Sequence, residues 1–239
     1  MIVRFGEYVA SLGLYTFYFI NFQLIYMDFS TAVIVGVPAI LIAIIIHEFS
    51  HGYAAYLLGD NTAKDAGRLT LNPLAHIDLF GTIIVPLLML VTMGAAFGWA
   101  KPVPFNPYNL KYPRFGPAIV AIAGPLSNLL VAIISLVAFK LLVPVFDAST
   151  NMLMIFLVYL TVLNLVLLIF NLIPIPPLDG SKVLFSFFSG IKYAPFRAVL
   201  EKQGPFILIM LILMDSFLNL HLFGKLINPI INFVYNVFI

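Results

Sequence analysis

The sequence has no cysteine and very few charged side chains. Of its 239 residues only 9% are charged, whereas 62% are hydrophobic. Without cysteine the chain forms neither disulfide bonds nor thiolate metal sites. Because about a quarter of the residues of a soluble domain are charged, this composition excludes an ordinary water-soluble protein. The formal net charge of +2 is too small to indicate binding to nucleic acid.

Several apolar segments approach the length that crosses a bilayer. A hydrocarbon core of about 30 Å requires about 20 apolar residues in a helix, and backbone groups inside it must bond to one another. We therefore predict an all-α integral membrane protein, a polytopic bundle of about six transmembrane helices. The apolar segments are 8–27, 31–58, 82–98, 117–143, 151–173 and 205–223, and an apolar tail follows at 226–239.

The chain shows no internal division. It has no polar linker, repeat or low-complexity tract, and no cleavable signal peptide is evident near Arg4 and Glu7. We expect a single membrane-embedded domain over 1–239, with a core at about 31–190 and peripheral helices at 8–27 and 205–239.

The Lys and Arg residues predict the orientation, because cytoplasmic loops carry an excess of them. Three basic connections should face the cytoplasm: 59–81, 99–115 and 181–203. If 82–98 crossed the membrane, the first two would lie on opposite sides, so we predict that 82–98 is re-entrant. The Pro-rich segment 98–109 favours extended chain, and short edge strands are expected near the cytoplasmic face.

Polar residues interrupt the apolar run LIAIIIHEFSHGYAAYLLGD, residues 41–60. On a helix His47 and His51 share one face and can provide two ligands of a tetrahedral zinc site. Glu48 lies beside that face, where it can act as general base without binding the metal. Ionisable residues at the bilayer centre cost at least about 2.5–3.5 kcal/mol, which favours a function. The alternative is a polar patch that joins helices through hydrogen bonds.

A catalytic zinc site with two histidines needs a third protein ligand. The candidate is Asp179, within the stretch NLIPIPPLDGSKVL at 171–184. The prolines of this stretch end regular helix, and Gly180 permits a tight turn. Spacing alone leaves two roles open for Asp179, a metal ligand or an N-cap of the next helix.

Together these motifs resemble the site-2 protease family of intramembrane zinc metalloproteases. The residues that carry the resemblance are H-E-x-x-H at 47–51, G-P-x-x-N at 124–128 and N-x-x-P-x-P-x-L-D-G at 171–180. The resemblance covers about 31–190 and implies that Asp179 is the third ligand of one catalytic Zn²⁺. RLTLNPLAHIDLFGTIIVP (68–86) and GWAKPVP (98–104) look like the short prokaryotic branch without a PDZ domain.

The resemblance implies an intramembrane zinc metalloendopeptidase. It would hydrolyse peptide bonds within or near transmembrane segments of membrane proteins, by zinc-activated water with Glu48 as general base. Its expected location is the plasma membrane of a prokaryote, with the active site nearer the cytoplasmic face. The expected partners are membrane lipids and a transmembrane protein or peptide substrate, and no nucleic acid. The sequence leaves the substrate and a homo-oligomer open.

Three further polar residues are candidates for the site. Asn128 and Asn171 are neutral amides in apolar helices, which suits them to stabilise an oxyanion; the alternative is interhelical hydrogen bonding. His76 could be an additional zinc ligand or could gate the site. We favour the interpretation that His76 is an interfacial histidine paired with Asp78.

Two other functions compete with the protease. Intramembrane His and acidic residues also serve ion pathways, so a metal or ion transporter is an alternative, although no pair of broken helices in an inverted repeat is visible. The other alternative is an inactive scaffold that binds membrane segments without cutting them. The intact set of His47, Glu48 and His51 argues against it.

Overall fold

The computed structural model describes residues 29–85, 88, 101–147, 151–218 and 220–238. Within them the chain is helical, and no strand occurs. The α-helices are α3 (Phe29–Leu57), α4 (Thr62–Asp65), α6 (Gly116–Leu142), α7 (Met152–Asn171), α8 (Asp179–Phe187), α9 (Ala194–Phe217) and α10 (Leu222–Phe238). Short 3₁₀ turns lie at Pro73–Ala75, Pro107–Asn109 and Ile191–Tyr193, and a π-helical turn at Leu79–Ile84.

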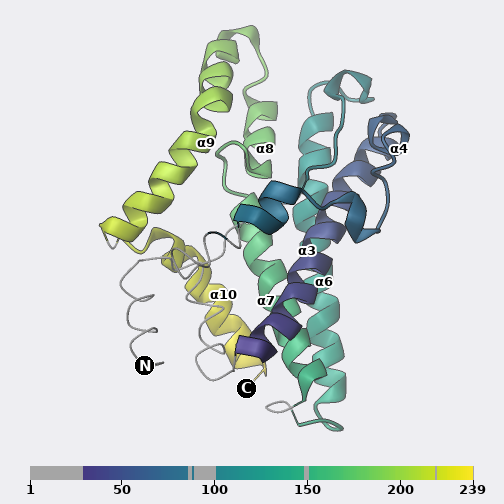
Figure 1. Cartoon of the computed structure of the whole chain (residues 1–239). Helices are drawn as coiled ribbons and strands as arrows, with labels where there is room; N and C mark the ends of the chain where they lie inside the picture. The colour runs from purple at the N-terminus through teal and green to yellow at the C-terminus, as the bar shows by residue number, and fades with distance from the viewer. Residues whose placement is uncertain (1–28, 86–87, 89–100, 148–150, 219, 239) are drawn as a thin grey trace.

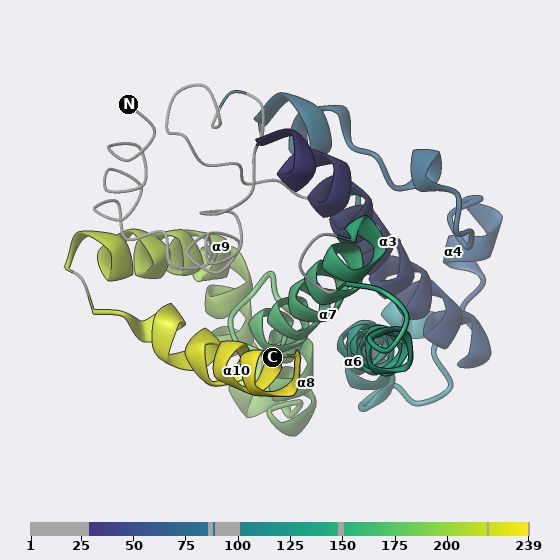
Figure 2. The same ribbon diagram turned by 90° about the horizontal axis from the view of Figure 1, so that it is seen from below.

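Three of these helices are long and apolar enough to cross a membrane. They cover Val33–Leu57 in α3, Gly116–Leu142 in α6 and Met152–Asn171 in α7. The three helices pack on one another as a compact bundle, and α8 lies against α6 (Figures 1 and 2). Helices α9 and α10 form a separate arm, which meets the bundle where α10 contacts α7.

The contact face of α3 repeats every fourth residue, as a helix that lies against its neighbours requires. The buried residues on this face are Val35, Ala39, Ala43, His47, His51 and Ala55. The first of them pack with Ile155, Tyr159, Leu160 and Leu163 of α7. Small side chains along this face let the helix backbones approach closely, as in other membrane bundles. The histidines therefore lie in the seam between α3 and its partners.

The predicted helices agree with the structure over the core and differ at the C-terminal end. The segments 31–58, 117–143 and 151–173 correspond to α3, α6 and α7. The segment predicted at 205–223 was placed wrongly at its start, because α9 begins at Ala194 and continues through Pro205. The apolar segment 8–27 and most of 82–98, with the predicted re-entrant turn, lie outside the described residues.

The predicted edge strands are absent from the described part of the chain. Residues 101–106 are irregular chain without ladder hydrogen bonds. Because Pro102 and Pro104 have no N–H, this segment cannot supply the regular series of donors that a strand needs. Bonds to α3 and to the turn after it hold this segment instead: Val103 N–H donates to the Glu48 side chain, and Asn106 N–H donates to Asp60.

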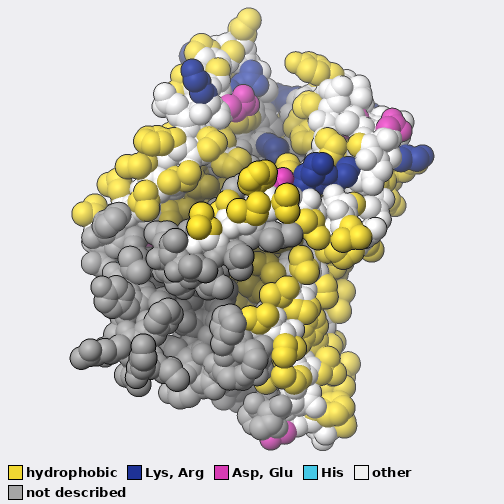
Figure 3. Space-filling model, in the orientation of Figure 1, with side chains coloured by type: hydrophobic (Ala, Val, Ile, Leu, Met, Phe, Trp, Pro, Cys, Tyr) yellow, Lys and Arg dark blue, Asp and Glu magenta, His cyan; other side chains and the backbone are white. Residues whose placement is uncertain are grey.

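Charged side chains gather at one end of the molecule. In Figure 3 most Lys and Arg side chains lie around the end where α4 and the tip of α9 are found, and the lower part of the described surface is apolar. Ile34 and Val37 of α3 and Ile133 of α6 are exposed apolar side chains. A bundle with apolar outer faces and charges at its end suits a bilayer.

Replacing Gly180 with Ala tests the turn that brings Asp179 to the bundle. A Cβ at Gly180 would collide with the backbone carbonyl of Leu172 and would lie 2.6 Å from the Ile173 oxygen. We expect Gly180→Ala to lower the free energy of unfolding by about 1–3 kcal/mol, measured as a lower Tm in detergent. Gly190→Ala is the matched control, because the nearest atom there lies 3.9 Å away. Equal losses in the two variants would contradict this explanation.

Candidate metal centre

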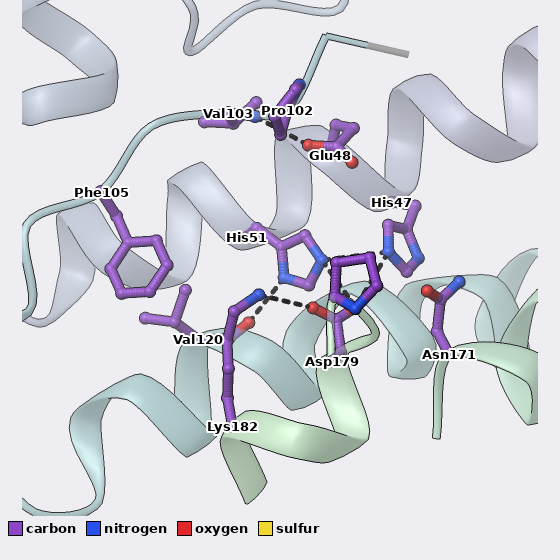
Figure 4. A pocket seen from close by; sticks show the side chains of 11 residues that line it. His47, Glu48, His51, Pro102, Val103, Phe105, Val120, Asn171, Asp179 and Lys182 are labelled. Atoms are coloured by element: carbon purple, nitrogen blue, oxygen red, sulfur yellow. Dashed lines mark hydrogen bonds and ion pairs between the residues drawn. The ribbon is translucent and has the colours of Figure 1, made fainter. Parts of the chain in front are cut away.

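Residues from two helices converge on one point at the base of a small pocket (Figure 4). His47 and His51 project from α3, and Asp179 is the first residue of α8. Asp179 Oδ2 lies 3.2 Å from His47 Nε2 and 3.1 Å from His51 Nε2, and the two Nε2 atoms are 3.0 Å apart. All three residues are buried. They form the one cluster of metal-ligand type found among the described residues.

Asp179 faces the two imidazoles and does not cap α8. The N-cap of α8 is Leu178, and no side chain caps this helix. The second oxygen of Asp179, Oδ1, accepts a hydrogen bond of 3.0 Å from Lys182 Nζ. Burial by itself raises the pKa of the Asp179 carboxyl, but the two imidazoles and the Lys182 ammonium outweigh burial and hold that pKa below its usual range. A carboxylate is thus present at neutral pH.

The hydrogen bond of His51 determines which of its nitrogens carries the proton. His51 Nδ1 lies 2.7 Å from the carbonyl oxygen of Val120 in α6. Since a carbonyl only accepts, Nδ1 donates, and Nε2 of the neutral ring keeps a free lone pair. This lone pair faces Asp179 Oδ2.

A chain of hydrogen bonds from Asn164 through Asn128 likewise determines which nitrogen of His47 carries the proton. Asn164 in α7 donates from Nδ2 to the Leu160 carbonyl, so its Oδ1 accepts from Asn128 Nδ2 at 2.8 Å. Asn128 also donates to the Ala43 carbonyl, and its Oδ1 accepts from His47 Nδ1. His47 Nε2 therefore also keeps a free lone pair.

Three acceptor atoms that face one another repel unless a proton or a metal ion lies between them. A tetrahedral zinc ion with bonds of 2.0–2.1 Å would separate its ligand atoms by about 3.3 Å. The three separations of 3.0–3.2 Å are close to this value. Two imidazoles and one carboxylate are also the ligand set of known catalytic zinc sites. The residues present fit a divalent metal ion.

Gly124 supports the two imidazole rings from α6. A Cβ at Gly124 would lie 2.5 Å from His51 Nε2 and 2.7 Å from His47 Cε1. The glycine of G-P-x-x-N is therefore needed because the two imidazole rings pack directly on its Cα.

Glu48 lies beside the triad and faces the pocket. Its Oε2 accepts a 2.8 Å hydrogen bond from Val103 N–H, and the side chain lines a cavity of about 140 Å³. The pocket is lined by the triad and by Glu48, Pro102, Val103, Phe105, Val120, Asn171, Pro177 and Lys182. Figure 4 shows Pro102 and Val103 on the Glu48 side and Lys182 on the opposite side.

The other candidate residues have different surroundings. Asn171 lines the pocket and donates from Nδ2 to the Leu167 carbonyl. Asn128 is fully buried and does not line the pocket, and its amide is used by His47, Ala43 and Asn164, so the predicted oxyanion role does not fit its position.

His76 lies outside the triad. Its Nε2 is bonded to the Thr70 carbonyl at 2.8 Å, and its ring is buried. The expected pairing with Asp78 is wrong, because the Asp78 carboxylate accepts from Gly81 N–H instead. His76 also holds the neighbouring chain, since its carbonyl accepts from Lys101 N–H.

Sequence reasoning missed Asn164 and Val103. Asn164 was visible as an isolated amide in the apolar segment 151–173, a signal that could have been followed. Val103 acts through its backbone N–H, which no side-chain pattern reports.

The fold and the site define a membrane-embedded helical protein with a buried two-histidine, one-carboxylate metal site. The model of the family described as Peptidase family M50 matches residues 142–214, which include Asp179 but not His47. Comparison with curated proteins finds "Putative zinc metalloprotease YwhC" of Bacillus subtilis, 44% identical over 155 residues, which are 62% of this chain and 66% of that protein. "Putative zinc metalloprotease Rip2" of Mycobacterium tuberculosis is 31% identical over 144 residues, which are 60% of this chain and 53% of that protein.

Over these regions the chain is similar to peptidase family M50, the site-2 protease family. The matched region spans less than two thirds of the length of each of these two relatives. No solved structure matches the chain.

Replacing Gly124 with Ala tests the support of the imidazoles. The added methyl group would displace both rings from Asp179, and we expect metal affinity to fall at least about tenfold, measured by titration with Zn²⁺ against a chelating dye. Gly36→Ala is the matched control in α3, because nothing lies within 4 Å of a Cβ there. Unchanged affinity in Gly124→Ala would contradict the packing of the rings on this residue.

Replacing Asn164 with Leu tests the chain of hydrogen bonds to His47. Asn128 would lose one partner and His47 its fixed orientation, so we expect a loss of Zn²⁺ affinity of about tenfold or more. Thr161→Val is the control on the same helix, because the Thr161 hydroxyl bonds the Leu157 carbonyl of its own helix. If both variants bind Zn²⁺ like the wild type, Asn164 has no part in the site.

Proposed function

We propose that this protein is an intramembrane zinc metalloprotease that cleaves transmembrane segments of other membrane proteins. The observation that carries the proposal is that Asp179 of α8 converges on His47 and His51 beside Glu48, and that the latter three lie on a helix long and apolar enough to span a bilayer. The names of the YwhC and Rip2 relatives support a zinc protease.

The triad would hold one Zn²⁺ through His47 Nε2, His51 Nε2 and Asp179 Oδ2. The bound ion would supply Lewis acidity and lower the pKa of a water molecule toward about 7. Lys182 holds the remaining oxygen of Asp179, which keeps this carboxylate oriented with Oδ2 toward the imidazoles.

Glu48 is the proposed general base. Val103 N–H holds its Oε2, so Oε1 is the oxygen that takes a proton from the attacking water and returns it to the leaving amine. Asn171 is the proposed donor to the oxyanion, because it lines the pocket and keeps a second N–H on Nδ2.

The size of the pocket bears on the form of the substrate. An α-helix with its side chains is about 10–12 Å wide, far more than a cavity of about 140 Å³ accepts. Carbonyls in a helix are also engaged in backbone bonds. The substrate would therefore enter as locally unwound chain, which favours transmembrane segments with helix-breaking residues near the cleavage point.

The distribution of basic residues predicts how the protein is oriented in the membrane. The basic end of the molecule would face the cytoplasm of a prokaryotic cell, and the metal centre would lie nearer that side. We also retain the bundle of about six transmembrane helices with a re-entrant segment at 82–98, and membrane lipids as partners.

The test pairs metal content with cleavage in Glu48→Gln. Glu48 is not a metal ligand, so we expect Zn²⁺ to bind as in the wild type while cleavage of a transmembrane peptide carrying central Gly and Pro residues falls at least about 10²-fold. Purification in detergent, metal analysis and a peptide-cleavage assay provide the measurement.

Glu201→Gln is the control, because Glu201 is exposed on α9 and lies outside the pocket. Cleavage by Glu48→Gln at the wild-type rate would exclude Glu48 as the base. Zn²⁺ in both proteins without cleavage by either would favour an inactive scaffold, and absence of Zn²⁺ from both would exclude the metal site.

A further inference from the structure

Residues 102–106 form a strap that lies along α3 over the metal centre. Pro102, Val103 and Phe105 of the strap line the pocket. Val103 is only 7% exposed, and its side chain packs on Gly52, where a Cβ would lie 2.8 Å from Val103 Cγ1. The Val103 side chain thus occupies the space that Gly52 leaves on α3, one turn after Glu48.

The strap has a single backbone donor at this point. Pro102 and Pro104 have no N–H, so Val103 alone can donate between them, and it donates to Glu48 Oε2 at 2.8 Å. A hydrogen bond to an ionised carboxylate is among the stronger ones in proteins. The position of the strap therefore determines the position of the Glu48 carboxylate.

Asp60 fixes the far end of the strap. It is fully buried just beyond α3. Oδ2 accepts from Asn106 N–H at 2.7 Å, and Oδ1 accepts from Asn109 Nδ2 at 3.0 Å. Thr62 donates to Oδ1 through both its N–H and its hydroxyl. Burial raises the pKa of Asp60, but these donors outweigh it and lower the pKa below its usual value.

The near end of the strap is fixed by neutral acceptors. Arg68, a buried residue, donates to the Lys101 carbonyl at 2.6 Å, and Lys101 N–H donates to the His76 carbonyl at 3.0 Å. The strap is thus held at both ends, and its middle touches the catalytic carboxylate.

We propose that Asp60 is a positioning residue for catalysis, which acts through the strap to hold Glu48 against the metal centre. This inference rests on the proposed protease function. Asp60 and Glu48 belong to the same helix and its immediate continuation, so the strap joins two points that α3 keeps at a fixed separation. Loss of the Asp60 bonds would release the strap from the helix and leave Glu48 without its donor.

The substitution Asp60→Asn breaks the strap bond selectively. The amide oxygen can still accept from Thr62 and Asn109, but the NH₂ group that replaces Oδ2 would face Asn106 N–H, and two donors repel. Asp65→Asn is the matched control, because Asp65 is exposed on α4 and contacts neither the strap nor the pocket.

The first measurement follows the strap without using activity. Because the natural chain has no cysteine, Val103→Cys introduces one buried thiol whose rate of alkylation reports release of the strap. We expect Asp60→Asn to accelerate this labelling about tenfold, while Asp65→Asn leaves the rate unchanged. An equal labelling rate in Asp60→Asn and its parent would overturn the role of Asp60 as an anchor.

The second measurement uses the cysteine-free enzyme and the same transmembrane peptide. We expect Asp60→Asn to lower kcat roughly ten- to a hundredfold, with a smaller change in KM and with unchanged Zn²⁺ affinity, because the strap bonds Glu48 and not the triad. A change confined to KM, or a normal kcat despite faster labelling, would overturn the positioning role. If the wild type does not cleave, the proposed function fails, and with it the catalytic role of Asp60, while the labelling rate still decides whether Asp60 anchors the strap.

Discussion

The metal centre depends on the hydrogen bonds that keep protons off the two facing imidazole nitrogens. The Val120 carbonyl accepts a hydrogen bond from His51 Nδ1–H, and Asn128 Oδ1 accepts one from His47 Nδ1–H. The polarity of the second bond is set in α7, where Asn164 is fixed by the Leu160 carbonyl. Inside an apolar bundle water is not available to bond these polar groups, so each group needs a hydrogen-bond partner from a neighbouring helix.

Close packing of α3 and α6 makes those bonds short enough. Gly124 gives the imidazoles a surface to lie on, and Ala39 and Ala43 let the helix backbones approach. Gly180 lets the start of α8 pack closely on the backbone of Leu172 and Ile173. This packing brings Asp179 Oδ2 within 3.2 Å of Nε2 of both imidazoles. The small residues and the polar residues thus act together, since neither set alone would build the site.

Much of the core could be predicted from the sequence because its signals are local. The apolar lengths predicted α3, α6 and α7, and the spacing of His47 and His51 placed both on one helix face. Asp179 was found through its motif, since spacing alone allowed a capping role. The roles of Asn128 and His76 were not predictable, because each depends on which backbone carbonyl lies opposite the side chain. The strap was expected as an edge strand, yet the N–H between its two prolines, that of Val103, bonds a side chain.

The sequence by itself determined that the chain enters a membrane, which helices form its core and which residues can bind a metal. These properties follow from composition and from spacing along one helix. Only the tertiary structure decided that Asn164 supports His47, that Gly124 carries both rings and that Val103 and Asp60 hold the region around Glu48. The reason is physical: a hydrogen bond between distant segments depends on how the helices pack, and the identity of either residue alone does not specify its partner.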